Sequence, residues 1–136
     1  MGNTQENRSM ILCDTNILIE IYRKNTIVIS ALSKISRYKT VAISDVTRAE
    51  ILVGARNKHE MQILVKELGQ LKCLPVKSEI SACSIQLLID YHLSHRLDFH
   101  DALIAATAIS YNIELFTLNV KDFAFISNIK LHDTNL

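Results

Sequence analysis

Short apolar runs alternate with longer amphipathic stretches along this 136-residue chain. The first run, 10–13, stops at polar residues that can cap a helix, and residues 17–22 are apolar enough to form one. A second run, 41–43, likewise ends at a capping residue, Ser44. The remaining strand candidates are 73–76, 114–118 and 129–131, the last as an edge strand.

Apolar residues at helical spacing predict helices between these strands. The predicted helices cover residues 17–22, 26–37, 44–55, about 61–71, 80–91 and 100–110. The last one is apolar on nearly every side and rich in alanine, which is typical of a buried helix. Because strands alternate with helices, the predicted fold class is α/β: a three-layer α/β/α sandwich around a mostly parallel central sheet.

Composition limits the class of protein. Hydrophobic residues make up 49% of the chain and charged residues 21%, which supports a single folded domain over residues 9–136 after a disordered polar lead-in at 1–8. A net charge of +1 argues against binding nucleic acid through overall charge. Three cysteines without CxxC spacing indicate a reducing, cytoplasmic setting. No apolar run reaches the roughly 18 residues of a membrane span.

Three carboxylates occupy positions where a parallel sheet collects functional groups. Asp14 follows the first strand, Glu50 lies within helix 44–55 near the side expected to face the sheet, and Asp101 stands in the first turn of the alanine-rich helix. Each also has a plainer explanation. Asp14 can cap a helix, Glu50 can form a long-range ion pair, and Asp101 can interact with the helix dipole.

Two further acids lie near these positions. Asp122 follows the late strand by a few residues, where a solvated loop residue is the plainer explanation, and Asp98 can cap the helix that contains Asp101. If these carboxylates met in one pocket they would repel one another, and a hard divalent cation such as Mg²⁺ would relieve that repulsion. Sequence spacing alone does not establish that they meet.

Four segments carry a resemblance to a known family. They are LCDTNILI (12–19), ISDVTRAEILVGA (43–55), DALIAATA (101–108) and LFTLNVKDF (115–123). In this order and spacing they resemble the PIN-domain nucleases, specifically the VapC-type toxins of bacterial and archaeal toxin–antitoxin pairs. The resemblance covers nearly the whole chain, from residue 10 to residue 131.

The resemblance implies a set of site residues. The catalytic, metal-binding acids that it implies are Asp14, Glu50, Asp101 and, less regularly, Asp122. Asn119 or Asp98 could share the role of the fourth metal ligand. The supporting polar residues that it implies are Asn16, Thr117 and Asn119. Apart from the resemblance, His100 is a candidate for contact with the substrate, and the basic residues that flank these segments are candidates for contact with phosphates: Arg23, Lys24, Arg48, Arg56, Arg96 and Lys121.

The resemblance also implies an activity and partners. It implies an endoribonuclease that depends on Mg²⁺, or on Mn²⁺ in its place, and hydrolyses structured RNA, above all tRNA, by a metal-activated water. The implied partners are a second copy of the chain and a small VapB-like antitoxin, with no membrane involved. Two alternatives stay open: a PIN nuclease acting in RNA maturation or on DNA flaps, and a non-catalytic PIN module that binds RNA or protein.

Overall fold

The computed structural model describes residues 8–133 as one α/β unit. The strands are β1 (Met10–Cys13), β2 (Thr40–Ser44), β3 (Lys72–Leu74), β4 (Glu114–Phe116) and β5 (Lys130–Leu131). The helices are α1 (Thr15–Tyr22), α2 (Thr26–Ile35), α3 (Asp45–Val53), α4 (Lys58–Leu68), α5 (Ser78–His95), α6 (Phe99–Tyr111) and the 3₁₀ helix η1 (Val120–Asp122). The lead-in predicted for residues 1–8 lies outside the described residues except for Arg8, whose guanidinium donates to the Ser36 carbonyl at 2.7 Å.

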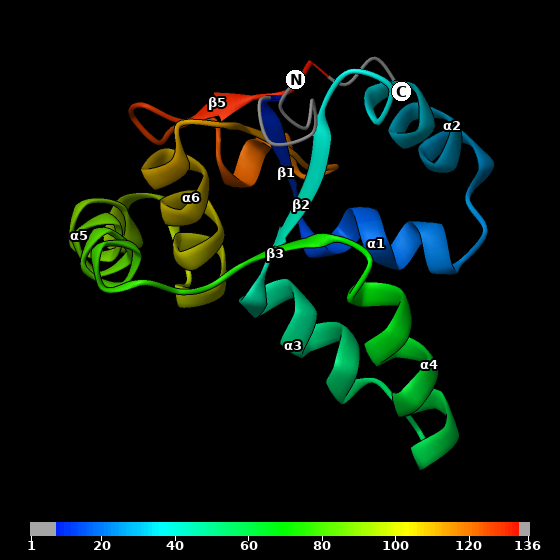
Figure 1. The fold of residues 1–136 in the computed structure, drawn as a ribbon. Coiled ribbons are helices and arrows are strands. Elements are labelled where there is room, and N and C mark those ends of the chain that lie inside the picture. Colours follow the sequence, from blue (N-terminus) through cyan, green and yellow to red (C-terminus); the bar gives the residue numbers. More distant parts are fainter. Residues whose placement is uncertain (1–7, 134–136) are drawn as a thin grey trace.

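The central sheet has the strand order β3-β2-β1-β4-β5, and all four neighbouring pairs are parallel (Figure 1). This confirms the predicted α/β class with its mostly parallel sheet. The chain winds from β1 through β2 to β3 on one side and then crosses back to β4 on the other side of β1. The order therefore reverses between β1 and β4, and open α/β sheets bind ligands at the carboxyl ends of the strands at such a reversal.

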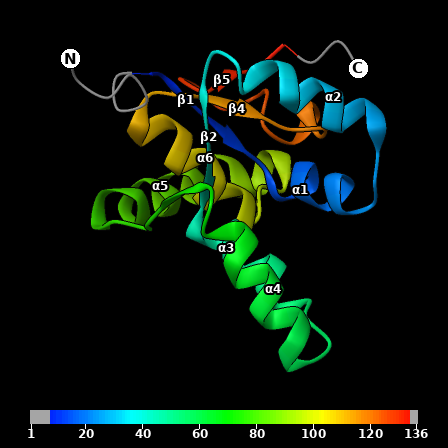
Figure 2. The same cartoon turned by 45° about the vertical axis from the view of Figure 1, so that its right-hand side comes forward.

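Helices cover both faces of the sheet (Figures 1 and 2). Alternate residues of β1 point to opposite faces, as a pleated strand requires. Ile11 and Cys13 belong to the apolar cluster that α1–α4 contribute to, whereas Leu12 belongs to the cluster built from α5 and α6. Burial raises the pKa of the Cys13 thiol to about 12, with a smaller contribution from the charge of Asp14, so this cysteine is a core residue.

The α5–α6 pair is held by its turns and by small residues. Arg96 ends α5 with a left-handed backbone (φ 59°), and Asn112 does the same for α6 (φ 54°). Ala102, Ala105 and Ala106 are fully buried, which lets the α6 backbone approach the sheet closely. The prediction of a buried alanine-rich helix is confirmed. Within residues 8–133 no helix has both the length and the apolarity to cross a bilayer.

Several element boundaries differ from the predicted ones. The strand expected at 73–76 ends at Leu74, because Pro75 has no N–H for a ladder hydrogen bond. The strand expected at 114–118 ends at Phe116, which places Thr117 beyond the sheet edge. The helix expected at about 61–71 is Lys58–Leu68, because the side chain of Asn57 accepts a hydrogen bond from the Glu60 N–H and caps its first turn.

Candidate active site

Asp14 lies at the carboxyl end of β1, where the strand order reverses. It caps α1, and its Oδ1 accepts a hydrogen bond from the Thr15 N–H at 2.8 Å. Its Oδ2 accepts a second one from the Thr117 hydroxyl, also at 2.8 Å. Only 4% of the residue is exposed, and this burial raises the pKa of the carboxyl, while the two hydrogen bonds lower it and the negative charge of Asp101 raises it further. Capping and a place in the polar site therefore coexist in one residue.

Glu50 reaches the same region from the middle of α3. The Thr15 hydroxyl donates to its Oε1 at 2.8 Å, and Thr15 also shares a hydrogen bond with the buried Thr47 hydroxyl at 2.9 Å. The Oε1 of Glu50 forms an ion pair with Nε2 of His100. The side chain is 44% exposed, so the expectation that Glu50 turns toward the sheet is wrong: it faces the open site between α1 and α6.

The basic residues beside Glu50 in the sequence serve other carboxylates. Arg48 pairs with Asp45 at 2.9 Å, and Arg56 pairs with Glu60 at 2.8 Å. Each pair joins side chains three or four positions apart, the geometry that favours local pairing over a longer one. Glu50 is therefore paired with neither arginine, and its cationic partner in the site is His100.

Asp101 enters the site from the first turn of α6. Asp98 caps this helix by accepting the Asp101 N–H at 2.8 Å, as one of the two explanations for Asp98 predicted. Oδ1 of Asp101 lies 3.2 Å from Nδ1 of His100. Potential ligand atoms of Asp98, His100 and Asp101 lie within 4.8 Å of one another, so the start of α6 gathers three side chains that could hold a metal ion.

The His100 imidazole brings the carboxylates into electrostatic contact. Its hydrogen bond with Asp101 and the charges of Glu50, Asp101 and Asp14 raise its pKa to about 9, against burial, which lowers it. The ring is therefore protonated at neutral pH and carries the positive charge between acids from three separate segments. From the sequence, His100 was predicted only as a candidate for contact with the substrate. Its position directly before Asp101 was the available signal for the larger role.

The supporting polar residues form a hydrogen-bonded bridge from α1 to the segment after β4. Nδ2 of Asn16 donates to the Thr117 hydroxyl oxygen at 3.3 Å, and Oδ1 of Asn16 accepts the Leu118 N–H at 3.3 Å. The Asn119 N–H donates to the same Thr117 oxygen at 3.0 Å. Thr117 thus connects this bridge to Asp14, while the bond recorded for Asn119 comes from its backbone.

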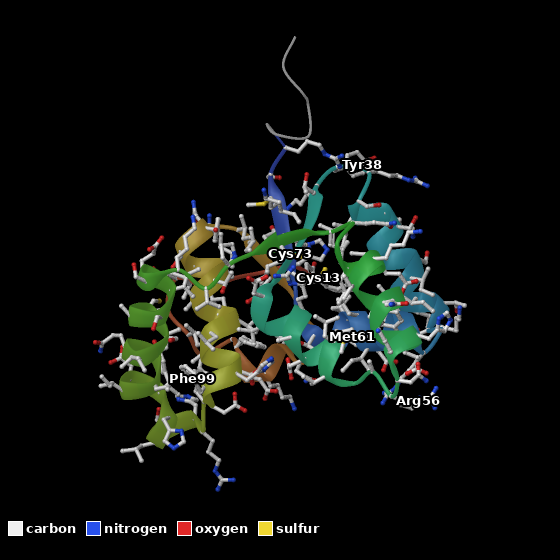
Figure 3. All side chains as sticks on the ribbon, turned by 60° about the horizontal axis from the view of Figure 1, so that its bottom comes forward. Cys13, Tyr38, Arg56, Met61, Cys73 and Phe99 are labelled. Atoms are coloured by element: carbon white, nitrogen blue, oxygen red, sulfur yellow. The ribbon has the colours of Figure 1, made fainter. Side chains whose placement is uncertain are left out.

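Asp122 lies at the end of η1 and lines a cavity of about 220 Å³ together with Asp98 and Asp101. Asp122 thus shares this cavity with the two carboxylates at the start of α6, whereas Asp14 and Glu50 are not among its lining residues. The remaining lining residues are His95, Arg96, Leu97, Lys121 and Phe125. Figure 3 looks toward the end of the molecule where Phe99 begins α6. Neither the histidine nor the phenylalanine of this cavity was singled out by sequence analysis.

The donor set fits a hard divalent cation. Carboxylate oxygens predominate, and Mg²⁺ binds through a few of them together with water and substrate oxygens. Like charges already compete here, since the pKa of Asp14 is raised by the charge of Asp101 as well as by burial. His100 could add a nitrogen ligand, which Mn²⁺ accepts more readily than Mg²⁺, only after its imidazole loses its proton.

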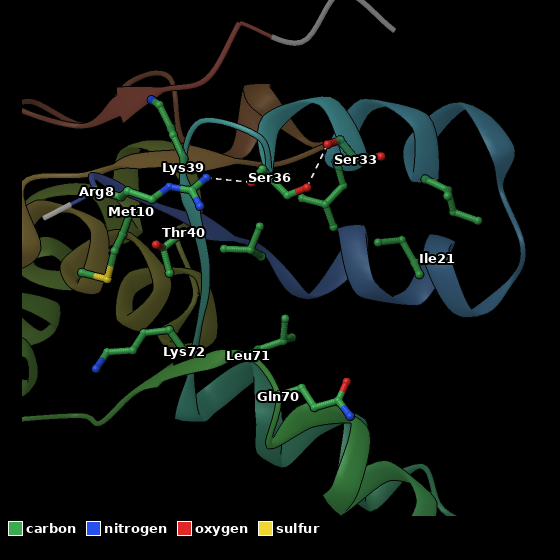
Figure 4. A pocket seen from close by; sticks show the side chains of 13 residues that line it. Arg8, Met10, Ile21, Ser33, Ser36, Lys39, Thr40, Gln70, Leu71 and Lys72 are labelled. Carbon is green, nitrogen blue, oxygen red and sulfur yellow. Dashed lines mark hydrogen bonds between the residues drawn. The ribbon is translucent and has the colours of Figure 1, made fainter. Parts of the chain in front are cut away.

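A larger groove of about 1000 Å³ lies at the other end of the sheet (Figure 4). Met10, Thr40 and Lys72, at the starts of β1, β2 and β3, mark that end. Apolar side chains of α1 and α2, including Ile21 and Ile29, line it with further basic residues at its rim. None of its lining residues in the described chain is a carboxylate, so the groove is suited to binding and not to this acid-based chemistry.

Comparison with known proteins places this fold and site in a family. The family model for the PIN domain matches residues 11–126. Ribonuclease VapC19 of Mycobacterium tuberculosis is 31% identical over 123 residues, which span 89% of this chain and 98% of that protein. A toxin–antitoxin complex from Klebsiella pneumoniae contains a chain that is 32% identical, with a TM-score of 0.73 over 88% of this chain and 94% of that one.

A second solved structure gives a similar result. VapBC2 from Rickettsia felis, bound to a DNA fragment from its promoter, has a TM-score of 0.78 at 25% identity, over 90% of this chain and 97% of that one. Because the match extends over nearly the full fold and the sequence identity exceeds 30% with a curated relative, the chain belongs to the PIN-domain family and, within it, to the VapC group.

Proposed function

We propose that the chain is a metal-dependent endoribonuclease and the toxin of a toxin–antitoxin pair. The observation that carries the proposal is the convergence of Asp14, Glu50 and Asp101, from three separate segments, on the His100 ring. The position of this site at the strand-order reversal supports it. The names of the relatives, Ribonuclease VapC, and the toxin–antitoxin complexes among similar structures support the same activity and role.

The chain's own residues would hold the acids in place for this reaction. Thr117 and the Thr15 N–H fix both oxygens of Asp14, and the Thr15 hydroxyl orients Glu50. A divalent cation, Mg²⁺ or Mn²⁺, held by Asp14, Glu50, Asp101 and Asp122 would activate water and neutralise charge developing on the RNA phosphodiester. No side chain needs to form a covalent intermediate. Structured RNA of the translation machinery, tRNA above all, is the proposed substrate, cut in the cytoplasm.

Paired substitutions test the catalytic part of this proposal. Asp14→Asn and Asp101→Asn keep the side-chain size while removing charge, and each should abolish RNA cleavage without unfolding the protein. Asp90→Asn is the matched control, because Asp90 is an exposed acid on α5 that bonds only to Gln86 in the described residues. Excess EDTA should stop wild-type cleavage, and added Mg²⁺ or Mn²⁺ should restore it. Full activity of either site variant, or cleavage in EDTA, contradicts the proposal.

The groove of Figure 4 is the surface we propose for the antitoxin. Its apolar floor would accept the apolar face of a partner helix, and the cationic side chains of Arg8 and Lys72 at its rim would favour acidic residues on that partner. The remainder of the antitoxin would cover the acidic site. A second copy of the chain would complete the assembly, as a homodimer.

A charge placed in the groove tests the partner. Ile29→Arg should prevent co-purification with the product of a small neighbouring gene, and Ile89→Arg, on the exposed face of α5, should not. Expression of the wild-type chain alone should arrest growth, and co-expression of the neighbour should relieve it. If cleavage is present but growth continues unimpaired, a nuclease of RNA maturation is the better description. If binding is present without any cleavage, the chain is a non-catalytic module.

A further inference from the structure

A second wall of the 220 Å³ cavity is aromatic. His95, near the end of α5, stacks on Phe125 with ring centroids 4.2 Å apart and an angle of 8° between the planes. Tyr91 meets Phe125 edge-on at 5.3 Å and His95 at 6.0 Å. The cavity is therefore bounded by π surface on one side and by the Asp98, Asp101 and Asp122 carboxylates on another.

The aromatic wall is held in place before any ligand binds. The Tyr91 hydroxyl donates to Oγ of Ser127 at 3.2 Å and accepts the Ser127 N–H at the same distance. This anchors the segment that carries Phe125 to the middle of α5. Phe125 packs against the core with part of its ring buried, whereas His95 is exposed. One ring is thus fixed by the core, and the ring stacked on it faces solvent.

Two cationic side chains at the cavity form no ion pair with a carboxylate of the described residues. Arg96 follows His95 in the left-handed turn between α5 and α6, and Lys121 lies within η1. Across residues 8–133 neither side chain forms an ion pair, although Asp98 and Asp122 are adjacent lining residues. An unpaired guanidinium and ammonium beside stacked rings are suited to the phosphates that flank a base.

We infer that this cavity is a subsite for one unpaired nucleobase of the RNA, stacked on the His95–Phe125 wall beside the acidic site. The inference rests on the proposed function, because Asp101 belongs to both the cavity and the acid cluster. The volume of 220 Å³ is below the roughly 300–1,000 Å³ of pockets for drug-sized ligands, which suits a single planar base. Arg96 and Lys121 bind the phosphates on either side of that base.

The subsite has a consequence for substrate choice. A base can enter it only when it is released from the stack of a helix, as in a loop, a bulge or an end, and such unstacked bases are commonly held on Phe and His rings. The enzyme therefore selects RNA for an unpaired base next to the scissile phosphate. Sequence preference at that position comes from stacking strength and the rim contacts.

Binding measured without cleavage tests the subsite. The probe is a hairpin oligoribonucleotide with 2-aminopurine in its loop, whose fluorescence falls when the base stacks, titrated with Asp14→Asn protein in Mg²⁺. Phe125→Leu keeps apolar volume and removes the ring, His95→Ala removes the exposed ring, and Phe125→Tyr restores a stacking face. Tyr38→Ala, which removes an exposed aromatic side chain far from the cavity (Figure 3), is the control.

The expected result is a loss of affinity of roughly 5- to 150-fold for Phe125→Leu and for His95→Ala, with weaker quenching of the probe. Phe125→Tyr and Tyr38→Ala should bind as the parent does. Unchanged affinity and quenching in both ring-removing variants overturns the subsite, as does a defect in antitoxin binding without one in RNA binding. Failure of the proposed nuclease activity is a separate outcome, recorded as no cleavage of the same hairpin by the wild-type protein in Mg²⁺.

Discussion

The hydroxyl of Thr117 donates a hydrogen bond to Oδ2 of Asp14 at 2.8 Å, between residues 103 positions apart in the sequence. This bond joins the ends of the two strands between which the sheet order reverses. It favours the charged form of a carboxyl that is almost completely buried. Two substitutions at position 117 separate the contribution of the hydroxyl from that of the side-chain shape.

Thr117→Val removes the hydroxyl with little change in shape, so Asp14 loses one of its two hydrogen bonds and its pKa rises further. A bond to a charged acceptor contributes about 1.5–3 kcal/mol, and loss of such supporting groups lowers metal affinity roughly 10- to 100-fold. Calorimetric titration with Mn²⁺ measures this loss. Thr117→Ser, which keeps the donor, should bind nearly as well as wild type. Equal affinity in the valine variant would show that the bond has no part in metal binding.

His100→Gln removes the positive charge that stands between the Glu50 and Asp101 carboxylates. The metal-free protein should lose about 1 kcal/mol of unfolding free energy, a magnitude typical of partly exposed charge pairs. Because a bound cation offsets the same repulsion, the loss should be smaller in Mg²⁺ than in EDTA. Urea unfolding under both conditions measures the difference. The exposed His59 gives the control His59→Gln, and an equal loss with and without metal would contradict the prediction.

Glu114 supplies a pH dependence away from the candidate active site. Its carboxylate accepts a hydrogen bond from Lys39 at 2.9 Å and contacts Nδ1 of His132 at 3.0 Å. The larger effect of Lys39 and the smaller effect of His132 hold the pKa of Glu114 below the ordinary 4.5. A lowered folded-state pKa stabilises the protein above pH 4.5, and the contribution is lost as the pH falls through the lowered value. Glu114→Gln should therefore be less stable than wild type at pH 7 by up to about 1 kcal/mol. Urea unfolding from pH 7 to pH 3 should show the two proteins converging; a constant difference would disprove this.

Ala105 tests the close packing of α6. The residue is fully buried in the core cluster that α5 and α6 share with the sheet, and Ala105→Leu inserts three carbons there. Overpacking of this kind costs about 1–3 kcal/mol of unfolding free energy. Ser110→Leu adds an exposed apolar side chain to the same helix and should change stability by less than about 0.5 kcal/mol. Denaturant unfolding distinguishes them, and similar values for the two variants would indicate that α6 is loosely packed.

Local features of the sequence predicted the elements well. The strand Met10–Cys13 was predicted with its observed bounds, and Ser44 caps α3 as expected, because apolar runs and capping residues act within a few positions. The same reasoning placed Glu50 toward the sheet, whereas the hydroxyl of Thr15 and the ring of His100 hold it at the open site. Those partners come from other segments, whose proximity depends on strand order.

The aromatic wall shows a second limit of sequence reasoning. His95 lies at the end of an amphipathic helix and Phe125 in an irregular segment 30 positions later, and neither belongs to a recognisable motif. Their stacking follows from the way η1 and the segment after it fold back on α5. The acid positions were accessible through family resemblance, because four segments match together. The cavity beside them needed the three-dimensional arrangement.

The separation of Asp14 from Thr117 has a consequence during synthesis of the protein. The central strand β1 leaves the ribosome well before its neighbour β4, which follows about a hundred residues later. Until then the growing polypeptide has no partner on that side for β1, and pairing between such distant segments is a late step of folding. Nascent chains and truncated fragments that end before β4 are therefore expected to lack the completed acidic pocket, because Asp14 and Thr117 can meet only after β4 has been made.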